Sequence, residues 1–170
     1  MDPFEDPDEE FVEPADTEID ALSLLRDDHQ HVLALFEQFE AAAPAALDDC
    51  RRMLAERACE LLTVHAQIEE EIFYPAVRAV IEDQELLDDA EVEHAVAKDL
   101  IEQIQTMDAD EALYDAKVRV LAEYLRHHIQ IEEDELFGLL ELADLDLDEL
   151  GEELATRKQE LLGSDFELAS

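Results

Sequence analysis

One short pattern, His-x-Gln-Ile-Glu-Glu, occurs twice in this chain of 170 residues, once from His65 and once from His128. In each copy a glutamate follows the histidine by four positions, and these glutamates are Glu69 and Glu132. On an α-helix that spacing places the imidazole and the carboxylate on one face, a turn apart. Each pair is therefore a predicted half-site for a hard or borderline metal ion, and the rest of the chain is interpreted as the scaffold that brings the two together.

The composition favours helices throughout the chain. It has three glycines, five prolines and no tryptophan, and alanine, leucine and glutamate are abundant. A chain of this length suits one domain with a core of its own. Because four long segments have a helical period and short connections, we predict an all-α fold: an antiparallel up-and-down four-helix bundle with an acidic N-terminal arm and an additional C-terminal helix.

Caps and prolines predict where the helices begin and end. Thr17 and Asp20 resemble a capping box at the start of the first helix, and Pro44 ends it. Pro75 should kink or end the second helix, and Gly138 has the same role in the fourth. The later helices are expected at about 47–74 with a continuation to 80, at 86–107 and at 111–142. The predicted units are a disordered or loosely docked arm at 1–16, the bundle at 17–143 and a helical extension at 144–170.

Each of the four helices has a stripe of inward residues that includes a histidine. His29 in the first helix and His94 in the third fill vacant positions among apolar residues spaced by three and four. The stripe of the second helix is predicted to comprise Ala58, Leu62, His65, Glu69, Ile72 and Ala76. That of the fourth is predicted to comprise Tyr114, Val118, Leu121, Leu125, His128, Glu132 and Leu139. The two halves are interpreted as copies of one helical hairpin.

The helix lengths predict that the four histidines meet at one level of the bundle. From His29 to the end of its helix is about 20 Å, and from the start of the next helix to His65 is about 27 Å, a match within a turn or two. Polar groups at this depth are costly unless they bind a metal. Four histidines, two glutamates and no inward cysteine disfavour iron–sulfur clusters and thiolate zinc. Two ions that share the carboxylates are predicted, with iron first and manganese or zinc behind.

Several short motifs also agree with those of a known family. They are Asp28-His29 with Leu35-Phe36, the segment from His65 to Pro75, Glu93-His94, and His127-His128 with Glu132-Glu133 and Leu136-Phe137. From about residue 20 to 143 the chain resembles the hemerythrin-like (HHE cation-binding) domains. The resemblance implies a bundle around a non-haem di-iron site, with His29, His65, His94 and His128 as terminal ligands and Glu69 and Glu132 as bridging carboxylates.

The chain departs from the oxygen carriers of that family at two positions. Lys98 stands where they have a further histidine, one turn after His94, and the last carboxylate, Glu132, is a glutamate four residues after its histidine instead of an aspartate five residues after it. An ammonium group cannot ligate a metal, so one iron would have more open or water-filled positions. This disfavours reversible oxygen carriage. Gly138, where many members have proline, is expected to affect only the kink.

The charge restricts the partners and the setting. The chain has 49 acidic and 11 basic residues, a formal net charge of −38, which makes nucleic acid and anionic membranes poor partners. Such a charge is screened at molar salt, so we predict halophilic adaptation; the alternative is a merely acidic protein. The absence of a signal peptide or a long apolar run predicts a cytoplasmic protein. Cys50 and Cys59 face opposite ways on one helix and are expected to be unbridged, small and buried.

Three functions are carried forward. The first is a di-iron protein that binds or reacts with a small diatomic ligand or peroxide (O2, NO or peroxide) as a sensor, scavenger or store, with no dedicated enzyme activity indicated. The second is a non-catalytic metal-binding or iron-handling regulatory module, and the third, ranked last, is a metal-free interaction bundle. The C-terminal helix packs either on the bundle or on a second subunit, giving a homo-oligomer. His31, His127, Glu70 and Glu133 are interpreted as solvated, with a supplementary ligand as the alternative for the two glutamates. Tyr124 is interpreted as core or as a donor to the site, and Lys98 as an indirect donor or as an exposed flank.

Overall fold

The computed structural model describes residues 20–42 and 48–168, and the regular structure in that part of the chain is entirely helical. The long helices are α1 (Ala21–Ala41), α2 (Asp48–Ile68), α4 (Gln84–Thr106), α5 (Tyr114–Ile131) and α7 (Leu147–Leu168). Two of them are extended by short segments: α2 by η1 (Glu69–Phe73) and α3 (Tyr74–Arg78), and α5 by η2 (Glu132–Leu136) and α6 (Phe137–Glu141). The predicted arm at 1–16, Thr17 and Pro44 lie outside the described residues.

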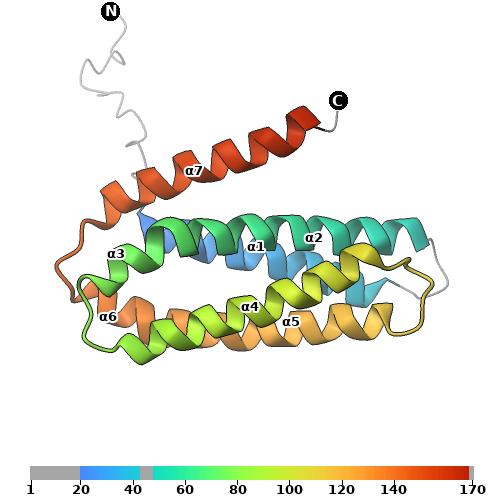
Figure 1. Cartoon of the computed structure of the whole chain (residues 1–170), viewed down its shortest axis with the longest axis horizontal. Helices are drawn as coiled ribbons and strands as arrows, with labels where there is room; N and C mark the ends of the chain where they lie inside the picture. The colour runs from blue at the N-terminus through green and yellow to red at the C-terminus, as the bar shows by residue number, and fades with distance from the viewer. Residues whose placement is uncertain (1–19, 43–47, 169–170) are drawn as a thin grey trace, which may run out of the picture.

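Each helix among α1, α2, α4 and α5 packs against two of the others. α1 contacts α2 and α5, and α4 contacts α5 and α2, so the four enclose a common interior (Figure 1). Two apolar clusters fill this interior. The first core cluster includes Val32, Phe36, Leu62, Leu121 and Leu125, and the second includes Leu25, Ile68, Phe73, Leu136 and Phe137. His29, three residues before Val32 and four after Leu25, therefore lies in a polar layer between the clusters.

At both glutamates of the repeated pattern the helix widens into a π-helical turn. The N–H of Tyr74 donates to the carbonyl of Glu69, and the N–H of Phe137 donates to the carbonyl of Glu132, each five residues back. The extra residue per turn shifts all later side chains of the helix by about 100° around the axis. Segments after Glu69 and Glu132 therefore present a different set of side chains to the core from that of a regular helix.

The shift corrects the ends of the two predicted stripes. Ile72 and Ala76 are only half-buried, and Leu139 is 42% exposed, whereas a regular helix would have turned all three inward. The buried side chains in these segments are instead Phe73, Tyr74, Val77, Leu136, Phe137 and Leu140. Pro75 does not end the helix, because it follows the π-helical turn at the start of α3. The earlier positions of both stripes are buried as predicted.

The last helix, α7, lies along one side of the others and contacts α1, α2 and η1 of the same chain (Figure 1). Leu150 and Leu154 are buried in the second core cluster. Packing of α7 against a second subunit stays a prediction. Cys59 is buried, but Cys50 is exposed, so the expectation that both are buried was wrong for Cys50 because it lies on the outer side of α2. Across the described ranges, no helix is long and apolar enough to cross a membrane.

Candidate metal centre

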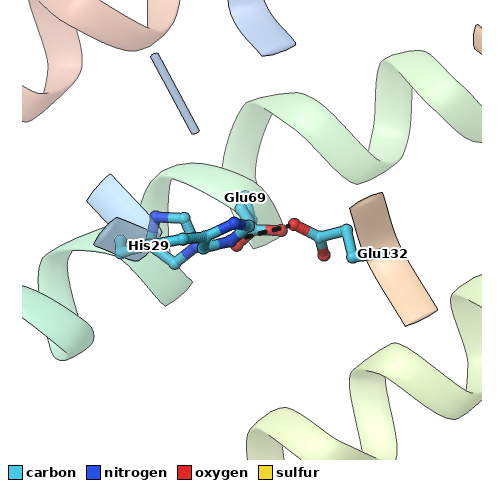
Figure 2. A group of neighbouring side chains, drawn as sticks. His29, Glu69 and Glu132 are labelled. Carbon is cyan, nitrogen blue, oxygen red and sulfur yellow. Dashed lines mark hydrogen bonds and ion pairs between the residues drawn. The ribbon is translucent and has the colours of Figure 1, made fainter. Parts of the chain in front are cut away.

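The six predicted site residues converge in the polar layer. Their exposed fractions are His29 2%, His65 3%, Glu69 0%, His94 5%, His128 7% and Glu132 3%. They come from α1, α2, η1, α4, α5 and η2, so every long helix of the interior supplies one histidine. Figure 2 shows the side chains of His29, Glu69 and Glu132 directed toward one another from separate helices. Four separate helical segments thus bring these six side chains to one place in the interior.

The inward-facing atoms fall into two overlapping groups. His29, His65, Glu69 and Glu132 form one group, and Glu69, His94 and His128 form the other, with the candidate ligand atoms of each group within 4.8 Å of one another. The Nε2 atoms of His29 and His65 are 3.1 Å apart. Oε1 of Glu132 lies 3.3 Å from His29 Nε2, and its Oε2 lies 3.1 Å from His128 Nε2. Glu69 contacts His65 Nε2 through Oε1 and belongs to both groups.

Within the described chain, several of these buried atoms have no hydrogen-bond partner beyond the other candidate ligands. They are both carboxylate oxygens of Glu69, Oε1 of Glu132 and Nε2 of His128. Buried polar atoms are nearly always hydrogen-bonded, and burying a carboxylate to 0% exposure is especially costly. Lone pairs of imidazole nitrogen and carboxylate oxygen are the donors that iron, manganese and zinc accept. The burial of these atoms and their chemistry therefore fit a metal centre.

Outside the centre, each histidine is held through its other ring nitrogen by a carboxylate from a different helix. His65 Nδ1 lies 3.1 Å from Asp28 Oδ2, and His128 Nδ1 lies 2.6 Å from Glu93 Oε2. His29 Nδ1 is 3.2 Å from Glu133, and His94 Nδ1 is 3.3 Å from Glu70. A carboxylate at Nδ1 fixes the ring orientation and leaves Nε2 directed at the centre, as in metal sites with carboxylate–histidine pairs. The sequence interpretation of Glu70 and Glu133 as solvated was wrong, since both are half-buried against histidines.

Two of these carboxylates in turn accept from a lysine. Lys98 Nζ lies 2.7 Å and 2.5 Å from the two oxygens of Glu70. Lys158, on α7, donates to Oδ1 of Asp28. Lys98 therefore stands outside the centre and reaches it through Glu70. It is also exposed, with a side chain that is 49% accessible, so both sequence alternatives, exposed flank and indirect donor, describe it.

Tyr74 is the inward residue that sequence reasoning missed. Its hydroxyl donates to Glu132 Oε2 at 2.7 Å and lies 3.2 Å from His94 Nε2, and the side chain is 1% exposed. Burial and the nearby Glu132 carboxylate raise the pKa of Tyr74 well above its ordinary value, so the phenol is neutral. Tyr124, the predicted donor, is half-buried and lines a cavity next to His94 and His128.

The charges inside the metal-free centre are set by the histidine–carboxylate pairs. Burial alone would lower the pKa of His65, but Glu69 and Asp28 outweigh it and raise that pKa to about 10. In the same way Glu132 and Glu93 overcome burial and raise the pKa of His128 to about 11. Burial lowers the pKa of His94. Protons on His65 and His128 thus occupy the positions that a cation would take.

Two small cavities adjoin the centre. One, of about 20 Å³, is lined by three site histidines and by mostly apolar residues: Leu62, His65, Ala66, Glu93, His94, Ala97, Lys98, Ile101, Tyr124, Leu125 and His128. The other, of about 40 Å³, reaches His128 and Glu132 from the side of Asp89 and Glu93. A cavity of this size admits one molecule no larger than a few atoms.

Of the histidines outside the centre, His31 and His127 are both exposed, as predicted.

Comparisons with known proteins agree with this geometry. The model of the family described as Hemerythrin HHE cation binding domain matches residues 20–140. A crystal structure of a hemerythrin HHE cation binding domain-containing protein from Mycobacterium kansasii has a similar fold, with a TM-score of 0.70, 22% identity, and coverage of 86% of this chain and 89% of that chain. A protein named DNA nickase from Nostoc sp. (strain PCC 7120 / SAG 25.82 / UTEX 2576) is 31% identical over 121 residues. Those residues are 69% of this chain but 32% of the relative, so the chain spans about a third of that protein. Since the family match covers well over half of its length, the chain belongs to the hemerythrin HHE cation binding domain family.

Proposed function

We propose that this chain is a non-haem di-iron protein whose antiparallel up-and-down bundle, at 17–143, holds two iron ions between its two core clusters. His29, His65, His94 and His128 are the proposed terminal ligands, and Glu69 and Glu132 the proposed bridging carboxylates. The observation that carries the proposal is the set of buried donor atoms on Glu69, Glu132 and His128 that have, among the described residues, no hydrogen-bond partner beyond the other candidate ligands. Manganese and zinc rank behind iron, because they accept the same donors but the family resemblance points to iron.

The residues around the centre favour a reactive or ligand-binding site. Bound iron would supply redox chemistry and open coordination positions. Lys98 leaves the second group with His94, His128 and carboxylates alone, so fewer protein atoms compete with an added ligand. The neutral hydroxyl of Tyr74 can donate a hydrogen bond, and the cavity of about 20 Å³ excludes anything much larger than O2, NO or peroxide. The protein is proposed to bind or react with such a ligand as a sensor, scavenger or store.

A non-catalytic iron-handling or regulatory module is the second candidate. It uses the same ligands, and the outer carboxylates that fix all four histidines favour it, because a rigid site retains its metal. A metal-free interaction bundle conflicts with Glu69, whose carboxylate has 0% exposure and, in the part of the chain that the structure describes, contacts other candidate ligands in place of a separate hydrogen-bond donor. Nucleic acid is not proposed as a partner despite the name of the Nostoc relative, because the net charge of −38 repels phosphate.

Metal analysis tests the di-iron proposal first. Protein loaded anaerobically with Fe²⁺ and freed of excess metal should contain close to two irons per chain. No retained iron would reject both of the first two functions. The two are separated by adding O2, NO or peroxide to the reduced protein and following the visible spectrum. A change in the charge-transfer bands supports the reactive site, and an unchanged spectrum supports the non-catalytic module.

A halophilic, cytoplasmic setting is proposed from the charge. The formal net charge of −38 produces self-repulsion that molar salt screens to a Debye length of roughly 3 Å. Melting temperatures of the protein in KCl should therefore rise from dilute buffer well into the molar range. A melting temperature that stays flat across this range would contradict the halophilic proposal and leave the metal site unaffected.

A further inference from the structure

The helix α7 supplies a charged side chain to the surroundings of the metal centre, although it lies beyond the residues 20–140 that match the family. Leu150 is 5% exposed and Leu154 is 0% exposed, and both pack into the second core cluster. Leu161 packs against the same cluster further along the helix. These contacts fix the position and the rotation of α7 on α1, α2 and η1.

Lys158 occupies a position in the apolar stripe of α7. It stands four residues after Leu154 and three before Leu161, the spacing that keeps side chains on one helix face. Its side chain is 28% exposed and donates to Oδ1 of Asp28, whose own side chain is 9% exposed. A lysine at such a position can bury its methylene groups against the core and direct its ammonium at a buried partner.

Asp28 connects Lys158 to the centre. Its two oxygens have separate partners: Oδ1 accepts from Lys158, and Oδ2 lies 3.1 Å from Nδ1 of His65. His65 directs its Nε2 at Glu69 and lies 3.1 Å from Nε2 of His29. A continuous chain of contacts thus runs from α7 through Asp28 to one of the two groups of candidate ligands. Without Lys158, a largely buried carboxylate oxygen would have no partner, and the carboxylate would be free to rotate away from His65.

We propose that Lys158 is a positioning residue for the metal centre: it orients Asp28, which orients His65, so that α7 stabilises the ion bound by His29, His65 and the two glutamates. The inference rests on the proposed function, because it concerns the metal that His65 would ligate. It goes beyond that function by assigning part of the site to a helix outside the matched family domain. Loss of an outer partner of a metal-bound histidine typically weakens metal binding by about 10- to 100-fold.

The test compares Lys158→Met with Arg157→Met in the full-length protein. Methionine is about as long as the lysine stem and keeps its packing, so Lys158→Met removes mainly the ammonium. Arg157, the neighbouring residue, pairs with Glu71 on η1 at 2.8 Å and is therefore matched in helix and charge. Glu71 is exposed and has no contact with a site histidine among the described pairs. Both variants lose one cation of α7, but only one of them loses the path to His65.

Each protein is loaded with Co²⁺, whose visible absorption reports ligand geometry and number, and then challenged with excess chelator. Wild type and Arg157→Met should release their two ions slowly, whereas Lys158→Met should release one of its two ions about 10- to 100-fold faster and show an altered cobalt spectrum. Lys158→Arg, which retains a donor for Asp28, should restore the slow release at least in part. Circular dichroism confirms that each variant is folded.

The outcomes separate the two proposals. If wild type binds two ions and Lys158→Met releases both as slowly as Arg157→Met does, Lys158 has no positioning role and the di-iron proposal stands. If both variants release metal faster than wild type and at the same rate as each other, docking of α7 matters and the path through Asp28 does not, which also overturns the inference. If wild type binds no ion, the di-iron proposal and this inference fail together.

Discussion

The two hairpins build their halves of the centre from corresponding residues, yet the halves differ in their surroundings. Asp28 holds His65 as Glu93 holds His128, and each of these carboxylates directly precedes the other histidine of its own half. Across the halves, Glu133 holds His29 and Glu70 holds His94. Each π-helical turn begins at the glutamate that faces the centre. The repeat therefore includes the outer carboxylates and the backbone distortion as well as the six proposed ligands.

The differences lie one step further out. Tyr74 and Phe137 occupy the same position, five residues after Glu69 and Glu132, but only Tyr74 brings a hydroxyl to the centre. Phe137 instead stacks on His29, with the ring centroids 6.3 Å apart and the planes at 12°. As a result Oε2 of Glu132 accepts from the Tyr74 hydroxyl, whereas Oε1 of Glu69 contacts His65 Nε2. Corresponding donors are thus placed in two unequal environments.

Loss of one inner histidine from either half tests whether the halves are equivalent as ligand sets. His65→Ala and His128→Ala should each abolish tight binding of at least one ion and remove most of the metal-dependent stability, about 4 kcal/mol when metal is present at a thousandfold excess over its dissociation constant. Denaturant unfolding with and without metal, together with metal analysis, measures both effects. His31→Ala is the matched control because His31 is exposed. A similar loss in the control, or retention of both ions in only one of the site variants, would contradict the equivalence.

The pH dependence of the metal-free protein tests the shared charge pattern of the halves. The pKa of His65 is raised to about 10 and that of His128 to about 11, from 6.5. Their stabilisation is complete below pH 6.5 and is lost as the pH rises from there through 10 and 11, at up to about 1.4 kcal/mol per pH unit for each histidine. His94, with its lowered pKa, and the acidic groups Glu132 and Asp28, also with lowered pKa values, favour unfolding as the pH falls, so stability should be greatest near pH 6.5.

Metal should reverse this trend, because His65 and His128 must lose their protons before they can ligate. Urea unfolding from mildly acidic to alkaline pH should show metal-free stability falling and metal-loaded stability constant or rising. Parallel curves for the two forms would mean that metal does not compete with the protons on these histidines.

Tyr74→Phe removes the main inner difference between the halves. The variant leaves Oε2 of Glu132 with one partner fewer, and a hydrogen bond to a charged group is worth about 1.5–3 kcal/mol. The metal-free protein should lose about 2 kcal/mol in denaturant unfolding. If the Tyr74 hydroxyl is what distinguishes the two halves, the spectrum of the NO or peroxide complex should also differ between the metal-loaded variant and the metal-loaded wild type. Phe137→Leu serves as the control for an altered ring in the opposite half. An unchanged free energy of unfolding in Tyr74→Phe would show that Tyr74 stabilises nothing at this position.

The sequence predicted the inner centre because histidine and glutamate stood in stripes of strict helical period up to Glu69 and Glu132. It failed for Tyr74 because the π-helical turn inserts a residue and rotates the later residues of the helix, and periodicity assumes that no such turn occurs. It failed for Glu70 and Glu133 because their partners belong to the other hairpin, which helical spacing within one segment does not show. Lys158 was beyond reach for a related reason: the leucine stripe of α7 indicates which face of the helix packs, but not that this face meets Asp28 on α1.

Gly138→Ala tests the smallest difference between the halves, the residue that comes just after each π-helical turn. Gly138 corresponds to Pro75 and lies in the helical segment α6, with no backbone angle that requires glycine. A Cβ added there would meet no atom within 4 Å. Alanine restricts the unfolded chain and has the higher helix propensity, so the variant should gain about 0.5–1 kcal/mol. Thermal unfolding of metal-free protein measures the gain, and Gly163→Ala, near the end of α7 and equally unobstructed, is the control for a helical glycine far from the centre. A loss of stability at 138, with a gain at 163, would show that the backbone after the second π-helical turn requires glycine. The two hairpins would then differ in backbone strain, because the same position after the first turn is occupied by Pro75.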